Sequence, residues 1–185
     1  MQTQYFASVA CELATSTGVS SPLLDSLRQL ADLACWKADQ VSNAALDATE
    51  FQQRMQVIFD QIQNSILSVP FDIHGAGYAD ISSSLSEVNR TACMLLLNGI
   101  HTGLRSSSPA LAEGVKEVQT QVNVISFLPN VPPKQYLFAT CIAKSFATDT
   151  DMSFMDQLIA SINDQSTETT AHLLLAMAHC RTAMW

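Results

Sequence analysis

The stretch NRTACMLLLNGIHTGLRSSSP, residues 89–109, decides the fold, because a long apolar run leads directly into polar residues. The run predicts a helix over residues 81–104 that is apolar on nearly every side and therefore buried. Helical spacing places Met94, Asn98 and His101 on one face of this helix. The amide and the imidazole are therefore either core polar groups with hydrogen-bond partners or groups that face a ligand cavity.

The composition is that of a globular protein with few charges. The chain has 185 residues, of which 48% are hydrophobic and 14% are charged. This length suffices to bury a large core within one domain. The net charge is -8 at pH 7, and the lysines and arginines form no cluster. Because nucleic-acid binding needs a positive surface, we expect no nucleic-acid binding by this chain alone.

Apolar residues recur with helical period along the chain, and strand patterns are nearly absent. The sequence therefore predicts a single all-α domain over residues 1–185, with about eight helices around a central buried one. We expect these helices at residues 3–15, 22–37, 47–68, 81–104, 109–126, 132–148, 152–163 and 167–183. The pairs Ser21-Pro22 and Ser108-Pro109 are typical of helix starts. Residues 69–80, which contain a proline and two glycines, predict an irregular loop at a pocket rim.

Cysteine spacing and short motifs argue against several kinds of chemistry. The five cysteines are far apart and lie in apolar helical patterns, which predicts free, buried thiols in a reducing compartment. Metal-ligand spacing, a phosphate-binding loop and a nucleophile-elbow motif are all missing, so we expect neither a metal nor a cofactor. No signal peptide or apolar run of about 18 residues occurs. We therefore expect no membrane span and an intracellular location: the cytoplasm, or the nucleus for a regulator.

Several segments share a helical packing pattern with one known family. They are the run Arg90–Leu97, the serines and proline at 106–109, the triplet at 127–129 and the helix at 137–149. These segments resemble the C-terminal helical domain of fungal-specific transcription factors of the zinc-cluster class. The resemblance is best over residues 85–165 and weaker before them.

The resemblance implies a helical effector domain that follows a zinc-cluster DNA-binding segment. Some members of the family sense sterols or other apolar metabolites in a helix-lined pocket. This chain departs from the family in two ways. The six-cysteine zinc cluster is missing, and Lys144 and Phe146 occupy positions where the family usually has a small residue and then an acid. A lysine within an apolar helix is costly unless it snorkels, pairs or faces a polar cavity.

The candidate site is an apolar cavity between helix 81–104, helix 132–148 and the 69–80 loop. The predicted catalytic residues are the available hydrogen-bond donors His101, Lys144 and His74. The predicted substrate-binding residues are Asn98, Met94, Trp36, Cys141 and Tyr78. The alternative for His74 is an exposed loop histidine. The alternative for the His101 and Asn98 pair is a set of core polar groups bonded to helix ends.

Two functions from different classes remain open. The first is a stand-alone, cofactor-independent cyclase, pericyclase or isomerase of fungal secondary metabolism, which would hold a terpenoid or polyketide in a near-attack conformation. The second is the ligand-sensing or effector domain of a fungal zinc-cluster regulator. The missing DNA-reading segment and Lys144 favour the enzyme. The expected partner is an apolar small molecule in either case, and a homodimer or a pure dimerisation module also remains open.

Overall fold

The computed structural model describes residues 19–65, 76–102, 108–128 and 131–147, and every regular element in them is helical. The elements are α2 (Ser21–Ser42), α3 (Ala48–Asn64), α4 (Ala76–Thr102), α5 (Pro109–Ser126), the 3-10 helix η2 (Pro133–Tyr136) and α6 (Leu137–Phe146). The all-α prediction is therefore confirmed for these residues. The helices expected at 3–15, 152–163 and 167–183 lie outside them. None of the described helices is both long and apolar enough to cross a membrane.

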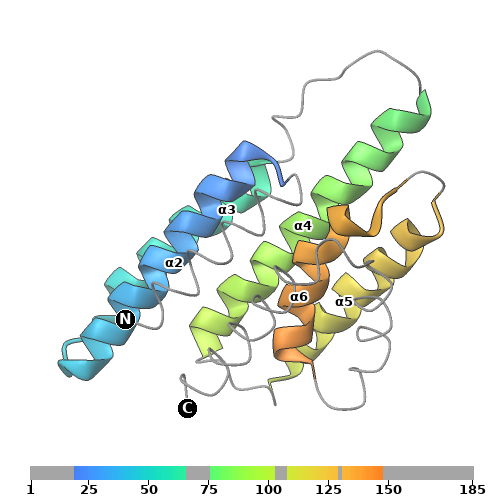
Figure 1. The fold of residues 1–185 in the computed structure, drawn as a ribbon. Coiled ribbons are helices and arrows are strands. Elements are labelled where there is room, and N and C mark those ends of the chain that lie inside the picture. Colours follow the sequence, from blue (N-terminus) through green and yellow to red (C-terminus); the bar gives the residue numbers. More distant parts are fainter. Residues whose placement is uncertain (1–18, 66–75, 103–107, 129–130, 148–185) are drawn as a thin grey trace.

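Helix α4 is the centre of the molecule. Figure 1 shows α2 and α3 along one side of α4 and α5 and α6 along the other. Helix α4 packs against all four of these helices and against η2. Val88, Ala92 and Cys93 of α4 have 0% exposure, and the leucines at 95–97 are buried as well. The predicted central buried helix is therefore confirmed.

Three predicted boundaries were wrong. Helix α4 begins at Ala76, inside the predicted 69–80 loop, because the alanines there favour a helix strongly enough to tolerate Gly77. Helix α2 continues to Ser42, since no proline or glycine interrupts it. The helix predicted at 132–148 begins instead as η2, and the backbone N–H of Gln135 donates to the carbonyl oxygen of Pro132 at 3.0 Å. Proline cannot donate from its own nitrogen, which favours such a tight turn.

Local side chains explain several helix starts. The carboxylate of Asp47 accepts hydrogen bonds from the backbone N–H groups of Thr49 at 2.7 Å and Glu50 at 3.2 Å, which caps α3. Prolines occupy the first turns of α2 and α5, where a missing N–H costs nothing. The residue that precedes α5 is Ser108, as expected, whereas α2 is preceded by Ser20, one residue earlier than predicted.

The turn from α2 to α3 is a Schellman motif without glycine. The N–H of Ala45 donates to the carbonyl of Gln40 at 2.9 Å, and the N–H of Ala44 donates to that of Val41 at 3.1 Å. This pattern needs a left-handed residue just after the helix, a position where glycine is common. Ala44 takes it with a φ of 52°. The turn therefore holds an L-residue in a strained backbone conformation.

Helices α4 and α5 approach each other closely at Gly114. A Cβ atom placed on Gly114 would lie 3.0 Å from Cδ1 of Leu95, whose side chain is 1% exposed. Contacts this short are rare between carbon atoms, because van der Waals attraction is best at about 3.5–4.0 Å. Gly114 therefore allows α5 to lie directly on the most buried part of α4.

We expect Ala44→Gly to raise the free energy of unfolding by about 0.5–1 kcal/mol, because glycine removes the steric penalty of the left-handed conformation. Urea denaturation measures the change. As the matched control, Ala38→Gly lies inside α2 and should lower the same quantity by about 1 kcal/mol. A loss of stability in Ala44→Gly would mean that this turn is not strained.

Candidate functional site

Aromatic rings and cations from three helices meet where α4 ends, in a cluster that we call the aromatic corner: Trp36 and Lys37 of α2, Phe51 and Arg54 of α3, and His101 of α4. The Trp36 and Phe51 rings are stacked with centroids 6.4 Å apart, and the His101 ring lies 6.1 Å from that of Phe51. Phe51 is 6% exposed, whereas His101 is exposed. The ring of Phe51 therefore joins all three helices.

Lys37 closes the end of α4. Its ammonium donates hydrogen bonds to the backbone carbonyl oxygens of Ile100 and His101, the latter at 3.2 Å. The last carbonyls of a helix have no partner within the helix, so a lysine donor there satisfies them and complements the helix dipole. The same Nζ lies 4.8 Å from the centroid of Phe51. Partial burial lowers the pKa of Lys37, because desolvation disfavours its charged form.

The cations of the corner already have partners. The guanidinium of Arg54 lies 4.4 Å from the centroid of the Trp36 ring and bonds the carboxylate of Glu50 at 2.8 Å. Both members of that ion pair are 48% exposed, so the pair contributes little to stability. Together Arg54, Trp36, Phe51 and Lys37 form a continuous stack in which each ring meets a cation. The imidazole of His101 and the guanidinium of Arg54 are the exposed groups of the corner.

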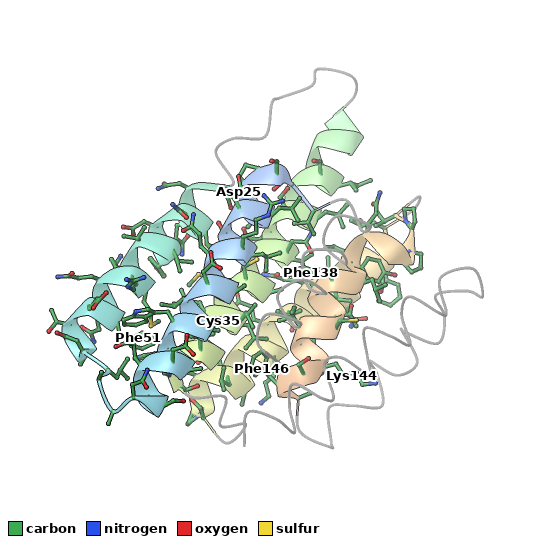
Figure 2. The ribbon with its side chains drawn as sticks, turned by 60° about the vertical axis from the view of Figure 1, so that its left-hand side comes forward. Asp25, Cys35, Phe51, Phe138, Lys144 and Phe146 are labelled. Carbon is green, nitrogen blue, oxygen red and sulfur yellow. The ribbon has the colours of Figure 1, made fainter. Side chains whose placement is uncertain are left out.

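The structure brings together only some of the predicted site residues. His101 and Trp36 meet through Phe51, and Asn98 and Met94 are half-buried on the same helix as His101. Figure 2 shows Lys144 on α6, toward the opposite side of the molecule from Phe51, so Lys144 is not beside the corner.

The remaining predicted residues lie away from the corner or outside the described part. Cys141 is buried within α6, and Lys144 is half-buried one turn further along the same helix. His74 lies outside the described residues. Tyr78 belongs to α4, but its side chain is not among those described. The catalytic and substrate-binding roles of all eight residues therefore stay predictions.

Sequence reasoning missed three members of the corner: Lys37, Phe51 and Arg54. The spacing of Glu50 and Arg54, four residues apart on a helix, is a signal for their ion pair. The contacts of Lys37 and Phe51 leave no such signal, because they join residues from different helices.

A second unusual polar group lies on α4. The side chain of Asn89 is 4% exposed, and among the described residues its Oδ1 has no hydrogen-bond donor. Oε1 of Gln121, on α5, is likewise buried without a donor in this part of the chain. A buried acceptor without a donor costs about 1–3 kcal/mol. The polar Oδ1 atom of Asn89 therefore lies in an apolar environment, next to Ala92 and Cys93 on the same helix.

The described thiols are free. Cys35 is half-buried, and Cys93 and Cys141 are fully buried. Desolvation raises the pKa of Cys93 and of Cys141 from 9.0 to about 12 in each case, despite the opposing influence of Arg90 and Lys144, respectively. Within the described ranges, histidine, cysteine and acidic side chains form no group of three that could hold a metal ion. Cys11 and Cys180 lie outside these ranges.

We expect Asn89→Leu to raise the free energy of unfolding by about 1 kcal/mol, because leucine has a similar shape and removes the unsatisfied acceptor. Chemical denaturation measures the effect. Gln53→Leu is the control on the exposed face of α3 and should change stability by less than about 0.5 kcal/mol. Destabilisation by Asn89→Leu, with the control unchanged, would show that the amide has a partner.

The buried thiols predict a loss of stability at alkaline pH. Their folded pKa values are raised above the unfolded value, so the stabilisation is complete below pH 9 and is lost as the pH rises toward about 12. Each thiol should lower the free energy of unfolding by at most about 1.4 kcal/mol per pH unit in that window. Denaturation at several pH values measures this slope. It should be smaller in a Cys93→Ala/Cys141→Ala variant, and an equal slope would contradict the assignment.

A comparison with protein families finds one whose domain matches most of the chain. The fungal specific transcription factor domain matches residues 3–177, which include all the described helices and the entire aromatic corner. No curated protein matches the chain, and no solved structure matches it. The match confirms the resemblance seen in the helical packing pattern and extends it over nearly the whole length. The chain therefore belongs to the fungal specific transcription factor domain family.

Proposed function

We propose that this chain is the effector domain of a fungal transcription regulator and acts in the nucleus. The observation that carries the proposal is the family match over residues 3–177. DNA contact would then come from a different polypeptide segment or a partner, because this chain has a net charge of -8 and no basic cluster. Sensing of an apolar metabolite would be the finer form of this role, and it rests on the resemblance to ligand-sensing members alone.

The physical character of the described helices supports an effector role. Helix α4 is enclosed by its neighbours, and the cations of the aromatic corner bind carbonyls, a carboxylate and rings of the chain itself. A regulatory domain requires a stable scaffold with surfaces for partners, and it requires no activated nucleophile. The geometry of the corner fits such a scaffold.

The cyclase, pericyclase or isomerase prediction gains no support from the family match and is not our proposal. That prediction placed His101 and Lys144 in the wall of one apolar cavity, where either side chain could donate to the substrate. The two residues lie on different helices, and the phenyl ring that His101 contacts is far from Lys144 in Figure 2. The enzymatic activity stays a prediction, which an activity assay would test.

A tethering experiment tests the effector role. Residues 1–185 are fused to an unrelated DNA-binding domain in a fungal host, and transcription of a reporter with the matching operator is measured. We expect the fusion to change reporter output several-fold, in either direction, relative to the DNA-binding domain alone. An effector domain should act wherever it is placed on DNA, whereas a metabolic enzyme should not.

Two variants make the result specific to the folded domain. Leu95→Asp places a charge in the core beside Gly114, so the fold and the reporter effect should both be lost. Gln53→Asp changes an exposed side chain of α3 and should retain the effect. An unchanged reporter with a stably expressed wild-type fusion would contradict the proposal.

A further inference from the structure

The two sides of α4 are covered unequally. Helices α2 and α3 together form a helical hairpin over residues 21–64, called the hairpin below. The hairpin buries seven apolar side chains over its 39 helical residues, whereas α5 and α6 bury twelve over 28. Helix α4 also contacts α2 and α3 less extensively than it contacts α5 and α6. Because apolar burial is the main source of stability, we expect the hairpin to be held less firmly than the opposite side.

Polar contacts fasten the hairpin to α4 at both ends. At one end, Nη1 of Arg90 donates to Oε1 of Gln63 at 3.1 Å, in an exposed setting. At the other end, Lys37 donates to the carbonyls of Ile100 and His101. Both donors are charged, but the bond from Arg90 is exposed, whereas Lys37 makes two bonds, of which the one to Ile100 is partly buried. Partial burial strengthens a hydrogen bond. Lys37 is therefore the firmer of the two attachments.

Lys37 and the two carbonyls that it contacts depend on each other as hydrogen-bond partners. The ammonium is partly desolvated when the hairpin is closed, so it depends on the two carbonyls to remain charged there. Those carbonyls in turn belong to the last turn of α4 and need a donor. Separation of the hairpin from α4 returns both partners to water together. Both hydrogen bonds of Lys37 therefore exist only while the hairpin lies against α4, and both are lost together when it separates.

We propose that the hairpin opens from α4 as a unit while α4, α5 and α6 stay folded, and that Lys37 is the latch that holds it closed. Opening would uncover the face of α4 that the hairpin covers. A partner that binds this face would shift the population toward the open state by its preference for that state. Any modification that removes the charge of Lys37 would shift it in the same direction.

The proposal does not depend on the effector role. Opening is a property of the isolated chain, and it can be measured without DNA, a reporter or a ligand. The reporter experiment and the opening experiment can therefore fail separately.

Native-state hydrogen exchange, read by mass spectrometry on the full chain, tests the latch. In the wild type, the core amides of α2 and α3 should exchange with a lower opening free energy than those of α5 and α6. Lys37→Met keeps the apolar stem and removes the charge. It should speed exchange in the hairpin by about tenfold or more, equivalent to about 1.4 kcal/mol, and leave α5 and α6 unchanged. Lys116→Met, on the exposed face of α5, is the matched control and should change neither region.

Two outcomes would overturn the proposal. Equal acceleration of all helices in Lys37→Met would show one cooperative unit, and unchanged hairpin exchange would show that Lys37 is no latch. If Lys37→Met does not fold, hydrogen exchange of the wild type at low denaturant concentrations tests whether the hairpin detaches. Equal opening free energies in the hairpin and in α5 and α6 would then refute detachment, and a lower value in the hairpin would support it.

Discussion

The structure depends on the enclosure of α4. The middle of α4 is apolar around most of its circumference and cannot be buried by one partner, because any single neighbour covers only one face. The molecule therefore places a helical pair on each side of α4, and the short 3-10 helix η2 adds a further contact. Each fully buried valine, leucine or isoleucine side chain on α4 contributes about 1.5–3 kcal/mol relative to exposure. Near its C-terminal end, α4 exposes the imidazole ring of His101.

The same enclosure explains which parts of the fold could be predicted from sequence. Helix α5 was predicted at residues 109–126, and the structure has it at Pro109–Ser126. The prediction succeeded because a proline marks the start of this helix and its apolar stripe continues to its end. The end of α2 was wrong because the Schellman turn uses Ala44, which gives no glycine signal. The start of α4 was wrong because a proline and two glycines suggested a loop, whereas the alanines among them sustain a helix.

The site was less predictable, for a geometric reason. Periodicity tells which residues of one helix share a face, but not how far two helices are rotated or shifted against each other. Trp36 and His101 were both selected from sequence, yet their common partner Phe51 was not. Lys144 was selected because a lysine is unusual in so apolar a helix, and the structure places it on α6, away from the aromatic corner. The corner is thus a product of packing between helices.

The close approach at Gly114 has an evolutionary consequence. At Gly114, the absence of a side chain leaves room for Cδ1 of Leu95 between α4 and α5. An alanine at position 114 requires the end of the Leu95 side chain to shift by a few tenths of an ångström, and a larger residue requires a smaller side chain at position 95 or a wider separation of the two axes. Substitutions at these two positions should therefore be correlated among related chains, with the total side-chain volume of the pair nearly constant.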